Sequence, residues 1–221
     1  SGYGLTLEDE LKILRVIKRI RETSPIAVRA TFLGAHAVGR AYKGRQAEYV
    51  DHVCNDMIPA VAKEGLADFV DVFCDKGFFT VEETAKIMKR GAEYGLRAKI
   101  HANELAVSGG VEVGVEQNAL SVDHLESMGD EQVEALRGTN TMPPLLPGCA
   151  FFLGITYPPA RKMIDAGLAV ALASDFNPGT APSGNMRFVV SLASIKMKMT
   201  PAEALNAATL NSACAMGESR D

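Results

Sequence analysis

The sequence predicts an α/β protein with a parallel sheet, a TIM-type (β/α)8 barrel in which about six of the eight strand–helix units are present. Short apolar segments alternate with amphipathic ones along all 221 residues, the pattern of a parallel α/β fold. Hydrophobic residues make up 47% of the chain, enough for one substantial core. Polar residues follow several apolar segments, as catalytic groups do at the carboxyl ends of barrel strands.

The strands are expected in the apolar segments, and helices in the segments between them. Six strands are expected, at residues 26–33, 69–73, 98–100, 121–123, 139–142 and 169–173. Three helix starts resemble capping boxes, with a threonine followed three residues later by an acid. These pairs are Thr6 with Asp9, Thr80 with Glu83, and Thr200 with Glu203.

Helical periodicity is clearest at residues 8–20, where apolar residues recur on one side, as in a helix that packs on a sheet. Residues 46–63 also predict a helical run. Gly109 and Gly110 are expected to form a flexible loop that opens a short helix.

The strand count predicts an incomplete barrel. A closed barrel of this kind needs eight strands and typically about 250 residues. Six strands are expected here, the sequence opens on a helix without an initiator Met, and residues 1–4 indicate a glycine turn leaving a strand. We therefore expect residues 1–221 to be a single catalytic-barrel segment of a larger protein. An open doubly wound sheet is the alternative, but no GxGxxG follows the first strand and no Walker loop is present.

Composition excludes several classes of function. The net charge is −4, and the absence of a basic stripe argues against a nucleic-acid partner. The apolar stretches are too short to span a bilayer, and the first residues do not resemble a signal peptide. The four cysteines form no CxxC pair and are expected to be buried free thiols. These features predict a cytoplasmic protein without a membrane partner.

The polar residues at strand ends predict a metal-assisted hydrolytic site. His101 and Asp175 each follow an apolar strand and are the candidate metal ligands, because imidazole and carboxylate groups bind such ions. Glu104, His124 and Asp175 form a candidate acid–base set for the water that the metal activates. The alternatives without a catalytic role are a hydrogen-bonded structural histidine at position 101 and an Asx-type turn at Asp175.

Two further histidines are assigned from their positions. His36 ends the first strand and would face the same cavity as a ligand or a substrate donor, whereas His52 lies in a helical run and is assigned a surface or packing role. A Ser-His-Asp hydrolase is disfavoured because no Gly-x-Ser-x-Gly elbow is present. A flavin or nicotinamide enzyme would need a phosphate-binding fingerprint that this sequence lacks.

The motifs resemble the amidohydrolase superfamily, and within it the imidazolonepropionase family. The resemblance covers essentially the whole chain, and its most specific parts are His-Ala-Asn-Glu at 101–104 and Ser-Asp-Phe-Asn-Pro-Gly at 174–179. Supporting segments are 1–5, 31–37, 121–126 and 145–148.

The resemblance implies a function and a role for each matching residue. It implies that one zinc or iron ion is bound by His101 and Asp175, and that a small-molecule substrate, 4-imidazolone-5-propanoate, is hydrolysed to N-formimidoyl-L-glutamate. His124 would polarise the ring or relay protons. The residues that would contact the substrate are Tyr3, His36, Glu104, Asn177, Gly179 and Thr180.

The sequence departs from the family pattern in its upstream part. The family's His-x-His pair on the first strand, a nearby substrate-binding arginine and a small β-domain are not in this chain, so the segment alone is expected to be inactive. Exposed barrel edges favour association with partner chains or as a homodimer. The alternatives are a deaminase of a nucleobase-like ring, and a non-catalytic segment that serves as an interaction module.

Overall fold

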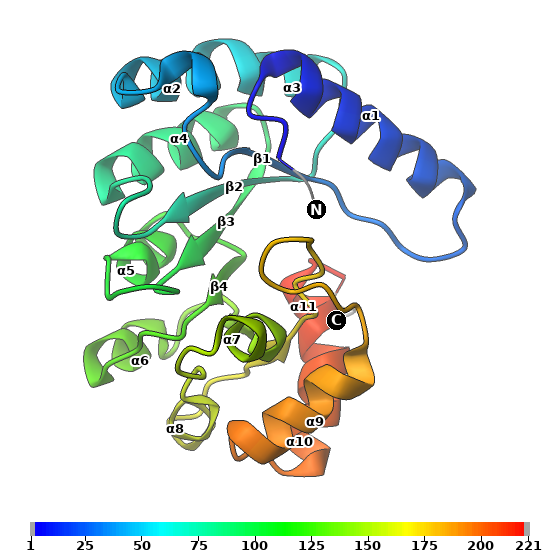
Figure 1. Ribbon diagram of the computed structural model, residues 1–221, viewed down its shortest axis with the longest axis vertical. Helices are drawn as coiled ribbons and strands as arrows, with labels where there is room; N and C mark the ends of the chain where they lie inside the picture. Colours follow the sequence, from blue (N-terminus) through cyan, green and yellow to red (C-terminus); the bar gives the residue numbers. More distant parts are fainter. Residues whose placement is uncertain (1–2, 219–221) are drawn as a thin grey trace.

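The computed structural model describes residues 3–218 and is built on one six-stranded parallel sheet. The strands are ordered in the sheet as they are in the chain, from β1 to β6. Their bounds are β1 (Thr31–Ala35), β2 (Phe69–Cys74), β3 (Arg97–Ala102), β4 (Ser121–His124), β5 (Pro144–Leu145) and β6 (Ala171–Leu172). Figure 1 shows helices following the strands around the outside of this curved sheet, so the predicted barrel-type α/β fold is confirmed.

The helices connect successive strands, so each strand delivers its carboxyl end to the same face. The α-helices are α1 (Leu7–Thr23), α2 (Gln46–His52), α3 (Ile58–Lys63), α4 (Val81–Glu93), α5 (Gly110–Glu116), α6 (Asp130–Leu136), α7 (Pro147–Leu153), α8 (Ala160–Asp165), α9 (Met186–Lys196), α10 (Pro201–Asn206) and α11 (Ser212–Ala215). Short η segments lie at Arg40–Tyr42, Val53–Met57 and Ala207–Asn211.

The expected helix starts are present. Thr80 and Thr200 form complete capping boxes with Glu83 and Glu203, and the Thr6 side chain accepts from the backbone of the residue three positions on. The run 46–63 is helical throughout, with a π-helical turn in its middle. Gly109 caps α5 with a φ of 84°, a conformation that glycine adopts without strain.

Two strand predictions were wrong in their bounds. Residues 26–30 are not in the sheet, and Ile26 is 74% exposed. The backbone N–H and carbonyl of Ala30 are instead hydrogen-bonded to Asp68. Residues 139–141 turn instead of extending: Gly138 has a φ of 70° and the Thr139 hydroxyl donates to the last turn of α6. The fifth strand therefore begins only at Pro144, although Met142 bridges to Ser121.

The outer edge of β6 is covered by side chains from the last helical segment. Asn211 Nδ2 donates to Val170 O and Ser212 Oγ donates to Leu172 O, each at 2.7 Å. These carbonyls point away from β5, where a further strand would otherwise pair. The contacts protect this edge from uncontrolled strand addition.

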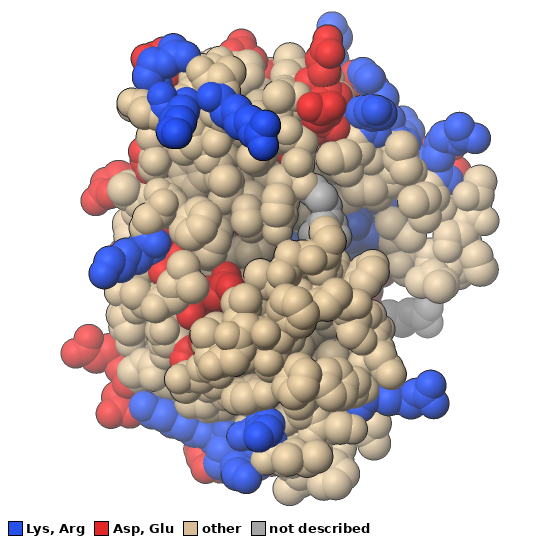
Figure 2. All heavy atoms as spheres, viewed as in Figure 1, with Lys and Arg blue, Asp and Glu red and all other residues tan. Residues whose placement is uncertain are grey.

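The core lies between the sheet and its helices. Every residue of β2 is buried, whereas buried and partly buried residues alternate along most of β3, and Asp123 of β4 is only partly buried. Cys54, Cys74 and Cys149 are buried free thiols as expected, whereas Cys214 is only half-buried. Among residues 3–218, no helix is long and apolar enough to cross a membrane. Figure 2 shows the basic side chains of one face spread around its edges. The turn expected at residues 1–4 falls partly on Ser1 and Gly2, which lie outside the described residues.

Candidate active site

The predicted site residues converge on one cavity at the carboxyl ends of the strands. The cavity has a volume of about 260 Å³, and every residue predicted for the site except Gly179 lines it. The sheet register brings its centre together, because His101 of β3 lies opposite Phe73 of β2 and Asp123 of β4. The imidazole rings of His101 and His124 have their centroids 5.2 Å apart. We refer to this space as the site cavity.

His101 is held in place by a neighbouring carboxylate. Nδ1 of His101 donates to Oδ1 of Asp71 on β2 at 3.0 Å, which leaves Nε2 as the ring atom that can bind a ligand. Burial by itself would lower the pKa of His101, but Asp71 outweighs this effect and raises it to about 9. Burial likewise opposes ionisation of Asp71, and the positive His101 ring nevertheless lowers the pKa of this carboxyl. The pair is a strong hydrogen-bonded unit at the floor of the cavity.

Asp175 is presented by a strained turn and keeps one free oxygen. Its φ is 51°, and its Oδ2 is buried without a hydrogen-bond partner. The Asx-type turn expected here is made by Asn177, whose Oδ1 accepts from the backbone of Gly179 and Thr180 at 2.9 and 2.8 Å. Asn177 Nδ2 also donates to Asp175 O at 2.7 Å. The turn thus positions Asp175 and leaves its carboxylate available.

His101 and Asp175 fit a metal ion on these observations. Both line the site cavity. The unpaired Oδ2 of Asp175, and Nε2 of His101, whose other ring nitrogen is held by Asp71, are suitable donors for zinc or iron. The two residues supply only part of a usual ligand set, since a catalytic zinc site has three protein ligands. Their assignment as ligands stays a prediction.

Glu104 and His124 form a buried carboxylate–imidazole pair beside these residues. Oε2 of Glu104 lies 3.7 Å from Nε2 of His124, and Oε2 of Glu126 lies 3.6 Å from Nδ1 on the other side of the ring. Burial lowers the pKa of His124, but the two carboxylates more than compensate and leave it raised. His124 is 3% exposed with a φ of 86°. Such backbone strain costs about 1–3 kcal/mol and gathers at functional sites.

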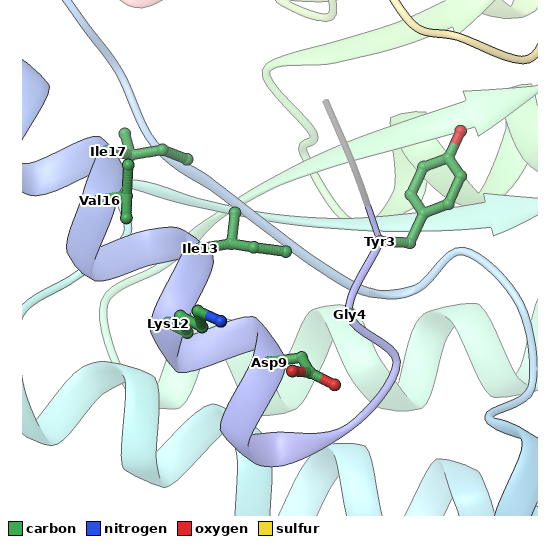
Figure 3. A pocket seen from close by; sticks show the side chains of 7 residues that line it. All are labelled: Tyr3, Gly4, Asp9, Lys12, Ile13, Val16 and Ile17. Carbon is green, nitrogen blue, oxygen red and sulfur yellow. The ribbon is translucent and has the colours of Figure 1, made fainter.

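Tyr3 and His36 form a flat aromatic wall of the cavity. Their rings are stacked with centroids 3.7 Å apart and planes 13° apart. Burial, and then the nearby His101, lower the pKa of His36 to about 4, so this ring is neutral at physiological pH. Figure 3 shows the Tyr3 side chain pointing away from α1, and Tyr3 also borders a mainly apolar hollow against Ile13, Val16 and Ile17 of that helix.

Three polar residues in contact with the site were not expected from the sequence. Asp71 could have been noticed as the one acid within an otherwise apolar buried strand. Glu126 follows His124 by two positions. Cys149, expected only as a buried thiol, donates from Sγ to Oε1 of Glu104 at 3.6 Å, and burial together with Glu104 raises the pKa of this thiol. His52 lies outside the cavity, where its Nδ1 contacts Asp56 at 2.6 Å.

The sheet is parallel and barrel-like, and histidine and carboxylate side chains lie at the carboxyl ends of its strands. This arrangement is typical of α/β-barrel enzymes, whose active sites lie at this face. The family model described as the amidohydrolase family matches residues 28–221. The chain therefore belongs to the amidohydrolase family.

Relatives agree with this assignment. The imidazolonepropionase of Flavobacterium johnsoniae is 60% identical over 217 residues, which cover 98% of this chain and 53% of that protein. The chain thus spans about half the length of the curated relatives it matches.

Solved structures share the fold. A guanine deaminase from C. acetobutylicum superposes with a TM-score of 0.72 at 17% identity, over 96% of this chain and 57% of its own. An adenosine deaminase from Xanthomonas campestris with bound zinc gives a TM-score of 0.60 at 16% identity, and the match covers 86% of this chain and 48% of the deaminase.

Proposed function

We propose that this chain is the downstream barrel segment of an imidazolonepropionase. The reaction would be hydrolysis of the cyclic amide of 4-imidazolone-5-propanoate to N-formimidoyl-L-glutamate. The 60% identity to the Flavobacterium johnsoniae enzyme supports this reaction. The observation that carries the proposal is the gathering of Glu104, His124 and Asp175 around one cavity, since these groups can manage the protons of a hydrolysis.

His101 and Asp175 would hold one zinc or iron ion, with upstream residues completing the ligand set. When bound, such an ion lowers the pKa of water and polarises a carbonyl oxygen. Asp71 would fix the ring orientation of His101 through the 3.0 Å hydrogen bond. Zinc bound to the adenosine deaminase of similar fold is consistent with this choice of metal.

Glu104 and His124 would transfer the protons of the reaction. The oxygen of the attacking water joins the carbonyl carbon, the ring C–N bond breaks, and one proton of the water ends on the departing nitrogen. Glu104 is placed to accept that proton, and His124, 3.7 Å from it, to polarise the ring or pass the proton on. Asp175 would assist as a further acceptor next to the water.

The remaining cavity residues would bind the substrate. Tyr3 and His36 present stacked rings, which suit a flat heterocycle, and a neutral His36 can exchange hydrogen bonds with its amide. Asn177, Gly179 and Thr180 would contact the amide and carboxylate regions of the substrate. The same groups already form the hydrogen bonds that hold the turn. They would therefore bind the substrate and stabilise the turn at the same time.

The segment by itself is proposed to be inactive. It spans about half of its relatives, and the residues lining the site cavity include no lysine or arginine to hold the substrate carboxylate. The full-length protein and this segment should be assayed for ring opening with added zinc. Turnover by the full-length protein alone is expected, and robust turnover by the isolated segment would contradict the proposed incompleteness.

Three features expected from the sequence stay predictions. They are the cytoplasmic location, the homodimer, and the absence of nucleic-acid and membrane partners. A small molecule suits the cavity of about 260 Å³, which lies just below the range of about 300–1,000 Å³ typical of pockets for drug-sized ligands.

A further inference from the structure

Three donor groups of different chemistry meet on one side of the site cavity. They are a carboxylate oxygen of Glu104, a ring nitrogen of His124 and Sγ of Cys149, and they all lie within 4.8 Å of one another. Each comes from a different element: the loop after β3, the end of β4 and helix α7. Cys149 is fully buried, His124 is 3% exposed, and the side chain of Glu104 is 9% exposed.

We propose that Glu104, His124 and Cys149 form a second cation site, separate from His101 and Asp175, for a soft divalent ion of the Zn²⁺ and Cd²⁺ class. Thiolate, imidazole and carboxylate are the ligands that zinc takes in proteins, and thiolate selects soft ions over magnesium or calcium.

The spacing of the donors suits such an ion. A tetrahedral zinc with bonds of about 2.0–2.3 Å holds its ligand atoms roughly 3.3–3.8 Å apart. Oε2 of Glu104 lies 3.7 Å from Nε2 of His124, and Oε1 of the same carboxylate lies 3.6 Å from Sγ of Cys149. One donor atom from each of the three residues lies within 4.8 Å of the other two, so a bound ion would draw the donors together by about 1 Å at most.

The local charge also suits a cation. Binding would displace the thiol proton of Cys149 to solvent. A divalent ion with one thiolate, one carboxylate and a neutral imidazole is then electrically neutral, which limits the cost of burying it. Both carboxylate oxygens of Glu126, on the other side of the His124 ring, are buried without a hydrogen-bond partner. No lysine or arginine is among the described residues that line the site cavity, and the His101 ring there is already paired with Asp71.

An ion at this site would occupy two residues of the proton-transfer machinery. Glu104 and His124 could then neither accept nor pass on a proton, so a soft metal in excess would inhibit hydrolysis while the resident metal stays bound. This consequence rests on the proposed function, whereas the binding itself does not.

Binding should be measured by titrating Cd²⁺ into the full-length protein with its resident metal in place, and following the ultraviolet charge-transfer band of a cadmium–thiolate bond. The band reports a sulfur ligand, and the resident site as proposed here contains none in this segment. We expect a band that saturates at one ion per chain and is reversed by Zn²⁺. Absence of the band in the unmodified protein would overturn the proposal.

Variants assign the band to its ligands. Cys149→Ser should abolish it, and Cys214→Ser, which changes a half-buried thiol on α11, should leave it intact. Glu104→Gln keeps the size of the side chain and should weaken Cd²⁺ binding without removing the sulfur ligand. A band that persists in a folded Cys149→Ser protein, checked by circular dichroism, would contradict the site. If that variant does not fold, unchanged Cd²⁺ affinity in Glu104→Gln would contradict it instead.

Discussion

Nδ1 of His101 and Oδ1 of Asp71 lie 3.0 Å apart on neighbouring strands, and this hydrogen bond settles which ring nitrogen of His101 faces the site. Asp71 is 3% exposed and sits in the middle of β2. Burying a carboxylate there is costly unless it is paired. The pairing indicates that Asp71 is retained for the orientation of His101.

Replacing Asp71 by Asn should therefore weaken the metal site. The amide could orient the ring but would lack the charge that supports it, and the loss of such a partner typically lowers metal affinity or activity about 10- to 100-fold. Metal affinity of the full-length protein, measured by competition with a chelator, checks this. Asp51→Asn, on the surface in a pair with Lys86, is the matched control. Equal affinities of the two variants would remove Asp71 from the site.

Replacing Glu104 by Gln should lower the rate of ring opening without releasing the resident metal. General acid–base groups contribute roughly 10²- to 10⁴-fold, and kcat should fall by that order because Gln cannot accept a proton. Steady-state kinetics with a parallel metal analysis check it. Glu116→Gln, an exposed residue at the end of α5, should have no effect. Normal kcat in Glu104→Gln would refute the proton-transfer role.

Replacing Tyr3 by Ala should raise KM more than replacing it by Phe. The stack on His36 has centroids 3.7 Å apart, and an aromatic pair of this kind is worth about 0.5–1.5 kcal/mol, or roughly a 2- to 10-fold change in KM. Phe keeps the ring and should lie close to the unmodified protein. Identical KM values for both variants would mean that the stack does not shape the substrate slot.

Replacing Gly91 by Ala should destabilise the fold. A Cβ at this position of α4 would lie 2.4 Å from Cγ1 of Val70 on β2, and overpacking of a core typically costs about 1–3 kcal/mol. Gly148→Ala in α7 is the control, because its Cβ would meet only Ser174 O at 3.5 Å and alanine favours helix. Urea unfolding should show a loss of stability for the first variant only.

Replacing Glu203 by Gln should cost stability in a pH-dependent manner. Both carboxylate oxygens of Glu203 accept from Arg161, one also accepts from the Thr200 backbone, and the pKa is lowered from 4.5 to about 2, chiefly by Arg161. A lowered carboxyl pKa stabilises the fold above the unfolded value and loses this contribution as pH falls through the folded value. The stability difference between the two proteins should be constant above about pH 5 and shrink between about pH 4.5 and 2. A difference that does not change over this range would contradict the pairing.

The architecture and most of the site were predictable from the sequence because those signals are local. Helix starts such as Thr80 with Glu83 are recognised within four residues, and polar residues such as His101 and His124 lie at the carboxyl ends of short strands. Parallel topology then brings those strand ends together. The starts of β1 and β5 were misplaced because contacts with Asp68 and with the end of α6, rather than local hydrophobicity, decide where these strands begin.

Contacts between distant segments could not be predicted in the same way. Asp71 and His101 are 30 residues apart, and Glu104 and Cys149 are 45 apart. Their meeting depends on strand register and on the position of α7, which no single sequence pattern encodes. Both contacts involve the site, so local patterns indicated the candidate residues but not their partners.

A substrate comparison on the full-length protein that contains this segment separates ring opening from deamination. 4-Imidazolone-5-propanoate, guanine and adenosine should be offered in parallel, with ring opening followed by loss of imidazolone absorbance and deamination by release of ammonia. We expect hydrolysis of 4-imidazolone-5-propanoate to N-formimidoyl-L-glutamate, loss of this turnover in Glu104→Gln, and no ammonia from either purine. Ammonia release from guanine or adenosine without turnover of the imidazolone would contradict this expectation.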